Sequence, residues 1–181
     1  MKLNKLQKKI GISFKDVQIL IQALTHKSFD TKNNYEKLEF LGDRVLGFVI
    51  SKKLLELYPN EKVGMIDKKL ANLVNKNKCF EIGKELELDN YILTGNTEKK
   101  KKVNIEKKII SDCCESLIGA IYIDKGFEVS SKFILNYWKN YLNLSDVTVI
   151  DSKTRLQEYS LKKFKTLPIY KLISNTGPRH K

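Results

Sequence analysis

Residues 35–50, YEKLEFLGDRVLGFVI, constrain the fold more than any other part of the chain. Nine of these sixteen residues are large and apolar, which predicts a buried helix. Three carboxylates, Glu36, Glu39 and Asp43, nevertheless lie among them. At about 100° per residue, Glu39 and Asp43 fall within about 60° of Glu36 around the helix axis. The three acids therefore share one narrow face, which apolar residues also crowd.

A second apolar segment, SDCCESLIGAIYID, repeats the pattern over residues 111–124. Asp112 and Glu115 are three positions apart and therefore share a helix face. The opposite side is apolar, with Leu117, Ala120 and Ile121. The chain thus offers two helices that each carry an acidic pair within apolar surroundings.

These carboxylates need positive partners. Burying an unpaired carboxylate is costly, and several carboxylates placed together repel one another. Either basic side chains or cations can neutralise them, and the pattern leaves both possibilities open, as it does a third in which the acids simply face solvent. Ligation by carboxylate oxygens alone suits Mg²⁺ or Mn²⁺ better than zinc. A pair of such ions could activate water and stabilise the leaving oxygen of a phosphodiester.

Most of the remaining chain has helical periodicity, and 181 residues allow one full domain with a small second unit. Apolar residues recur at three- and four-residue steps, which predicts further helices over 14–24, 68–74, 80–86, 109–123, 130–142 and 154–163. The polar, lysine-rich stretch 94–104 is predicted to be a loop, and 168–174 alternates as a strand does. The predicted fold class is therefore mainly α.

The net charge indicates which kind of partner the protein binds, and the cysteines indicate its cellular compartment. With 34 lysines and arginines against 21 acidic residues, the net charge of +13 favours a polyanionic partner, nucleic acid ahead of a membrane surface. Cys79, Cys113 and Cys114 lack the paired spacing of a zinc site or a disulfide framework, which fits a reducing cytoplasm. No apolar run approaches the ~18 residues of a membrane span. We therefore expect a soluble cytoplasmic protein.

Three motifs give the chain a family resemblance. YEKLEFLGDRVL, from residue 35, resembles the signature of the ribonuclease III endonuclease domain. DCCESLIGAIYIDKGF, from residue 112, resembles the second acidic block of that family, and ALTHKSF, from residue 23, resembles its early motif. The three motifs occur in the family's order, so the resemblance covers about residues 10–145.

The resemblance implies a helical domain that dimerises and cuts double-stranded RNA with a divalent metal ion, Mg²⁺ or Mn²⁺. Carried over to this chain, the metal ligands are Glu39, Asp112 and Glu115. Asp43 and Glu115 are the implied catalytic acids, and Glu36 matches an acid that supports the site. The products implied are 5′-phosphate and 3′-hydroxyl ends, made while processing ribosomal and other structured RNA precursors.

The chain departs from the family pattern at a few positions. Arg44 replaces a small residue, and Ser116 takes the usual place of alanine. Neither change removes an implied ligand, so they bear on local packing. His26 and Ser28, in the early motif, are expected to hold structure rather than to act as base and nucleophile.

The C-terminal piece is similar to the start of a double-stranded-RNA-binding domain. DSKTRLQEY matches its first helix, and IYKLISNTGPRHK matches its first strand and the following loop. In that family these parts touch successive minor grooves of the duplex. The implied RNA contacts are Thr154, Gln157, Glu158, Pro178 and His180. The later strands and final helix of such a domain are absent, so this sequence is either a fragment of a longer protein or ends in a relic with weak RNA affinity. We expect a fragment.

The predicted organisation is a catalytic domain over 1–145, a linker over 146–152 and a partial RNA-binding domain over 153–181. The predicted function is a ribonuclease III-type endoribonuclease that acts as a homodimer without a membrane partner. One alternative is a double-stranded-RNA-binding protein that does not cleave. Another is a structural helical protein whose acids form ion pairs only.

Overall fold

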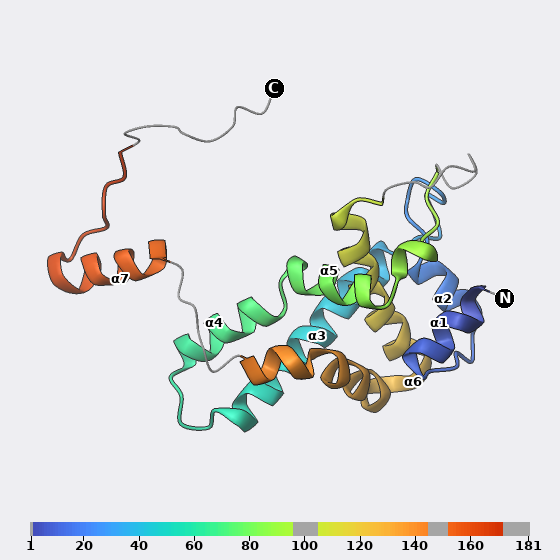
Figure 1. Ribbon diagram of the computed structural model, residues 1–181, viewed down its shortest axis with the longest axis horizontal. Helices are drawn as coiled ribbons and strands as arrows, with labels where there is room; N and C mark the ends of the chain where they lie inside the picture. The colour runs from blue at the N-terminus through green and yellow to red at the C-terminus, as the bar shows by residue number, and fades with distance from the viewer. Residues whose placement is uncertain (1, 96–104, 145–151, 172–181) are drawn as a thin grey trace. The chain divides into compact units, whose positions relative to one another are not determined.

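The structure, a computed structural model, describes residues 2–95, 105–144 and 152–171. It divides into two compact units, Met1–Asp146 and Val147–Lys181 (Figure 1). The predicted linker 146–152 lies almost entirely outside the described residues. No helix in the described ranges is long and apolar enough to cross a membrane.

The first unit is built from helices. They are α1 (Lys2–Ile10), α2 (Val17–Ala23), α3 (Glu36–Leu57), α4 (Val63–Leu73), α5 (Lys76–Glu85), the 3₁₀ helix η1 (Leu88–Asn90) and α6 (Lys107–Leu144). The described residues contain no strand, and one isolated parallel bridge joins Thr25 to Leu93. The predicted mainly α fold class is therefore confirmed.

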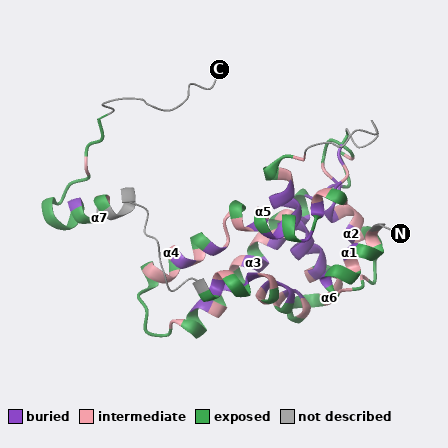
Figure 2. Ribbon diagram, viewed as in Figure 1, coloured by how far each residue is buried: buried purple, intermediate pink, exposed green. Residues whose placement is uncertain are grey.

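Helices α3 and α6 form the centre of this unit. Along α3 the buried positions recur every three or four residues, at Leu38, Gly42, Val45, Leu46, Val49, Ile50 and Leu54. Every residue from 111 to 121 of α6 is buried. These two helices pack against each other more extensively than any other pair among the described helices. Figure 2 shows the buried positions concentrated where the helices of the unit face one another.

A glycine interrupts α6. Gly126 has φ 81° and ψ −178°, a conformation that favours glycine because it has no Cβ. The interruption separates the two helices predicted over 109–123 and 130–142. In the second of them Trp138 is fully buried, and its Nε1 donates a hydrogen bond to the Leu73 carbonyl (2.8 Å), which ties it to α4.

Some helix boundaries differ from those predicted. α2 begins at Val17 rather than at residue 14, because the Asp16 carboxylate accepts a hydrogen bond from the Gln18 amide (2.8 Å) and caps the helix. α4 begins at Val63, earlier than predicted. α1 is not among the predicted helices, although Leu6 on its inner side is fully buried.

The second unit contains α7 (Ser152–Phe164), which confirms the helix predicted over 154–163. The strand predicted over 168–174 is wrong in its described part, since residues 168–171 have no regular secondary structure. A strand needs a hydrogen-bonded neighbour, and the described part of this unit supplies none. Ile169 accordingly is 88% exposed. The rest of the predicted strand lies outside the described residues.

Candidate active site

Two glycines allow α3 and α6 to cross closely. A Cβ added to Gly42 would lie 1.8 Å from the backbone oxygen of Glu115, and one added to Gly119 would lie 2.2 Å from that of Leu38. Neither position can therefore carry a side chain unless a helix backbone moves. The crossing brings the acidic face of α3 against the acidic face of α6.

Three carboxylates meet at this crossing. Glu39 of α3 and Asp112 and Glu115 of α6 each offer one oxygen, and these atoms lie within 4.8 Å of one another. Asp112 and Glu115 are buried, and Glu39 is half-buried. We call these three residues the acidic cluster. The structure thus brings together the three residues that the resemblance implies as metal ligands.

Two lysines bring positive charge to the acidic cluster. Nζ of Lys76, the first residue of α5, lies 3.1 Å from Glu39 Oε1 and 3.2 Å from Glu115 Oε2. The same ammonium forms a short ion pair with Asp112 Oδ1. Nζ of Lys108 lies 2.9 Å from the other Asp112 oxygen, Oδ2. Basic side chains, one of the possibilities left open by the sequence, therefore contribute to neutralising the cluster.

The pKa values of the two acids that α6 contributes to the acidic cluster, Asp112 and Glu115, are shifted in opposite directions. Burial raises the pKa of Glu115 to about 7, and Lys76 offsets only part of that effect. Burial also acts to raise the pKa of Asp112, but the ammonium groups of Lys76 and Lys108 outweigh it and hold this pKa below its usual range. Burial lowers the pKa of Lys76, whereas its contacts with Asp112, Glu115 and Glu39 more than reverse the shift. Asp112 and Lys76 therefore form a firmly ionised pair.

Asp43 and Glu36 lie beside the acidic cluster rather than in it. Asp43 forms a short ion pair with Arg44, yet it is near enough for its charge to raise the pKa of Glu115. Glu36 is exposed in the first turn of α3 and pairs with Lys27 at 3.1 Å. The three acids predicted on one face of this helix thus have three different sets of partners.

The early motif supports the chain that leads into α3. Ser28 Oγ lies 2.7 Å from His26 Nδ1 and accepts a hydrogen bond from the Gly95 amide (3.0 Å). The Tyr35 amide donates to the Thr25 carbonyl (2.9 Å), and the Tyr35 ring lies 5.6 Å from that of His26. Both His26 and Ser28 therefore make contacts that hold this loop together, in keeping with the structural role expected for them.

The implied RNA-contacting residues are described only in part. Thr154, Gln157 and Glu158 lie on α7, where Gln157 is half-buried. The side chains of Thr154 and Glu158, and all of Pro178 and His180, lie outside the described residues. Their role in binding RNA stays a prediction.

The acidic cluster fits a hard divalent ion. All three potential ligands are carboxylates, which Mg²⁺ and Mn²⁺ prefer. The Lys76 ammonium already contacts one oxygen of each carboxylate, so the cluster accommodates positive charge at this point. The residues present are therefore suited to hold a divalent ion between α3 and α6.

Comparison with known proteins agrees with this site. The family model described as Ribonuclease-III-like matches residues 16–142, which include the whole acidic cluster. The chain belongs to the ribonuclease III family. Ribonuclease 3 of Pelagibacter ubique (strain HTCC1062) is 63% identical over 183 residues, which cover 100% of this chain and 82% of that protein. Ribonuclease 3 of Leptospira interrogans (strain Fiocruz L1-130) is 40% identical over 185 residues, covering 98% of this chain and 75% of that protein.

Solved structures of ribonuclease III have the same fold. A nuclease domain of ribonuclease III from Campylobacter jejuni matches with a TM-score of 0.70 and 35% identity, over 77% of this chain and 97% of that one. A second structure of that domain matches with a TM-score of 0.68 and 37% identity, over 76% of this chain and 94% of that one. The predicted family and the predicted enzyme class, an endoribonuclease, are confirmed.

The two lysines at the site are not among the predicted site residues. Lys108 precedes Asp112 by four residues on one helix, a spacing that brings side chains together, so the sequence carried this signal. Lys76 is 36 residues away from Asp112 and belongs to another helix. Only the packing of α5 against α6 brings its ammonium to the acidic cluster.

Proposed function

We propose that this ribonuclease III family chain hydrolyses the phosphodiester bonds of double-stranded RNA with a divalent metal ion. The products are 5′-phosphate and 3′-hydroxyl ends, and the substrates are precursors of ribosomal and other structured RNAs. The observation that carries this proposal is the acidic cluster inside a chain of net charge +13. Grouped carboxylates repel RNA phosphates, whereas the rest of this basic protein attracts them. A cation bound by the carboxylates would remove the repulsion and could take part in cleaving the phosphodiester.

Glu39, Asp112 and Glu115 are the proposed ligands of Mg²⁺, with Mn²⁺ as the alternative. Held by these carboxylates, such an ion would supply Lewis acidity to activate water and to stabilise the leaving 3′-oxygen. The close crossing of α3 and α6 fixes the three carboxylates relative to one another, which favours catalysis because ligand positions need no rearrangement. Asp43 and Glu115 are proposed to be catalytic residues, and Glu36 is proposed to support the site.

The chain is proposed to form a two-fold homodimer through α3. Phe40 and Phe48 on this helix are 65% and 61% exposed. Phe48 contacts Phe127 edge-on, with ring centroids 5.6 Å apart, and the Arg44 guanidinium lies 4.9 Å from the centroid of the Phe40 ring. Exposed aromatic and arginine side chains are typical of protein interfaces. One of the Campylobacter jejuni structures is described as having a flexible region involved in dimer formation, which supports a dimer here.

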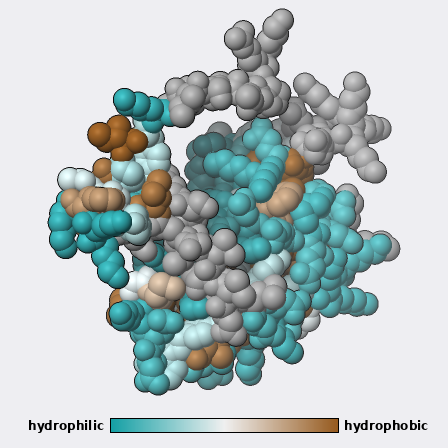
Figure 3. Space-filling model, turned by 60° about the vertical axis from the view of Figure 1, so that its left-hand side comes forward, coloured by the Kyte–Doolittle hydropathy of each residue, from teal (hydrophilic) through white to brown (hydrophobic). Residues whose placement is uncertain are grey.

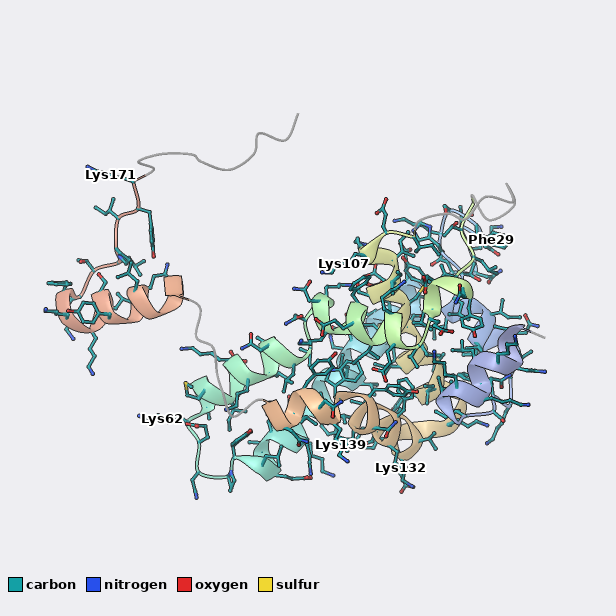
Figure 4. The ribbon with its side chains drawn as sticks, viewed as in Figure 1. Phe29, Lys62, Lys107, Lys132, Lys139 and Lys171 are labelled. Atoms are coloured by element: carbon teal, nitrogen blue, oxygen red, sulfur yellow. The ribbon has the colours of Figure 1, made fainter. Side chains whose placement is uncertain are left out.

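Basic side chains are proposed to bind the RNA backbone. Lys107, Lys132 and Lys139 of α6 are exposed, and Figure 4 shows them on the surface of the first unit. Among the coloured residues in Figure 3 most of the visible surface is hydrophilic, with separate hydrophobic patches. Phosphate contacts release counterions, so we expect RNA affinity to fall steeply with salt. In the second unit the proposed contacts remain Thr154, Gln157, Glu158, Pro178 and His180.

The domain division and the compartment are also part of the proposal. The catalytic domain is assigned to 1–145, the linker to 146–152 and the partial RNA-binding domain to 153–181. A cytoplasmic location is supported by the three unpaired cysteines, Cys79, Cys113 and Cys114, because disulfides are rare in reducing compartments.

Cleavage of a long RNA duplex with and without Mg²⁺ tests the proposed activity. The wild-type chain should cut only with metal, and Glu115→Gln should lose cleavage while still binding RNA. The matched control is Glu56→Gln, which changes an exposed glutamate of α3 paired with Lys53 and should leave cleavage unchanged. Binding without cleavage under any divalent metal would instead support a non-catalytic double-stranded-RNA-binding protein. The absence of both metal dependence and RNA affinity would support a structural helical protein.

A further inference from the structure

Lys76 is held by the same three carboxylates that are proposed to bind the metal ion. Its Nζ lies 3.1 Å from Glu39 Oε1 and 3.2 Å from Glu115 Oε2, and it also pairs with Asp112 Oδ1. Mg²⁺ binds carboxylate oxygens at about 2.0–2.1 Å. An ion at that distance from these oxygens would crowd the ammonium and repel it, because two cations would share one partly buried point. The ammonium and the metal ion therefore exclude each other.

We propose that Lys76 is an internal counter-ion of the active site, which a divalent metal ion displaces when it binds. Without metal, the ammonium offsets the mutual repulsion of the acidic cluster and keeps its carboxylates together. With metal, the side chain leaves the cluster for solvent. This inference rests on the proposed metal site and makes Lys76 a positioning residue that sets how tightly the site binds metal.

The local structure allows this exchange. The backbone at Lys76 is anchored, because Asn75 caps α5 by accepting hydrogen bonds from the amides of Asn77 (3.0 Å) and Lys78 (3.1 Å). The Lys76 side chain itself is 52% exposed and has a long flexible stem, so its ammonium can move without disturbing the fold.

Lys108 is placed differently from Lys76. Its side chain is 75% exposed, and it contacts the Oδ2 atom of Asp112 rather than Oδ1. Lys108 can therefore keep its ion pair when a metal ion takes the oxygen that Lys76 releases. The exchange accordingly involves Lys76 alone.

Calorimetric titration of the chelator-treated full chain with Mn²⁺ tests the exchange without RNA or activity. Lys76→Met should bind Mn²⁺ at least about tenfold more tightly than wild type, since no ammonium has to be displaced. The matched control, Lys84→Met, changes another lysine of α5 that is 48% exposed and pairs with Asp89 at 2.7 Å, and it should bind like wild type. Unchanged or weaker affinity in Lys76→Met would overturn the exchange. Absence of Mn²⁺ binding in wild type and Lys76→Met alike would overturn the metal site itself and the exchange with it.

Thermal melts of the same proteins provide a second readout. In chelator, Lys76→Met should melt below wild type, because its carboxylates have lost their main counter-ion. Added Mn²⁺ should then raise the Tm of Lys76→Met by more than it raises that of wild type. An equal rise in both proteins would contradict the exchange.

Lysine reactivity in the wild-type chain tests the exchange of Lys76 for metal even if Lys76→Met does not fold without metal. Acetylation of surface amines, read by mass spectrometry, should modify Lys76 slowly in chelator because its ammonium is held by three carboxylates. Added Mn²⁺ should accelerate the modification of Lys76 and leave that of Lys84 unchanged. A Lys76 reactivity that stays constant or falls with metal would overturn the proposal.

Discussion

Replacing Gly42 with alanine should pull the two halves of the acidic cluster apart. The added Cβ would lie 1.8 Å from the Glu115 backbone oxygen, whereas ordinary contact begins at 3.4 Å, so the helices must separate by the difference, about 1.6 Å. Overpacking of this kind typically costs ~1–3 kcal/mol, which corresponds to a loss of roughly 2–12 °C in Tm for a chain of this size. A misplacement of about 1 Å at a catalytic site can cost about 100-fold in rate. We therefore expect Gly42→Ala to lose at least that much metal-dependent cleavage.

Gly64 of α4 provides the control, because it lies away from the α3–α6 crossing and from the proposed dimer face of α3 and has no atom within 4 Å of an added Cβ. Gly64→Ala should gain up to ~1 kcal/mol from the higher helix propensity of alanine and should cut RNA like wild type. Thermal melts followed by circular dichroism and cleavage of an RNA duplex with Mg²⁺ measure the two effects. If Gly42→Ala melted and cut like wild type, the close crossing would not be what positions the acidic cluster.

Three other buried groups should respond measurably to substitution. Because the pKa of Glu115 is raised from 4.5 to about 7, the stabilisation that its neutral form gives is complete below about pH 4.5 and is lost as pH rises through about 7. Glu115→Gln should abolish this fall in the free energy of unfolding, which is worth roughly 3 kcal/mol. Denaturant melts with chelator at about pH 5 and about pH 8 measure it, and an equal fall in wild type and Glu115→Gln would contradict the prediction. Trp138→Phe removes the donor to the buried Leu73 carbonyl and should cost about 1–3 kcal/mol, so an unchanged denaturation midpoint would count against that hydrogen bond. The Ser116 hydroxyl is buried and lacks a hydrogen-bond partner among the described residues, so Ser116→Ala should raise stability by about 1 kcal/mol, and a lower Tm would show that the hydroxyl has a partner.

The positions of the main helices and their acidic faces are determined by the sequence alone. Apolar residues at three- and four-residue steps predict α3 and both parts of α6, because helical side-chain geometry depends on neighbours within about one turn. The same spacing places Asp112 and Glu115 on one face. Motif resemblance then identifies the family, since the residues that carry it are contiguous in the chain. The second unit shows the limit of such reasoning, because a strand depends on a partner strand and local alternation does not supply one.

Helix periodicity by itself leaves open how the acids are grouped and what neutralises them, and the tertiary structure decides both. Helix geometry places Glu36, Glu39 and Asp43 on the same face of α3 and does not distinguish among them. In the packed structure only Glu39 belongs to the acidic cluster, whereas Glu36 pairs with Lys27 and Asp43 pairs with Arg44. Periodicity does not encode these choices, because they depend on the distance at which two helix backbones cross.

Lys76 is the clearest case of this dependence. It is 36 residues from Asp112, and nothing in its own segment distinguishes it from the other lysines of this basic chain. Its ammonium reaches three carboxylates because α5 packs beside α6 and because two glycines let α3 approach. Local sequence therefore determined which acids could form a site, while contacts between distant segments decided which of them form it and which cation they share.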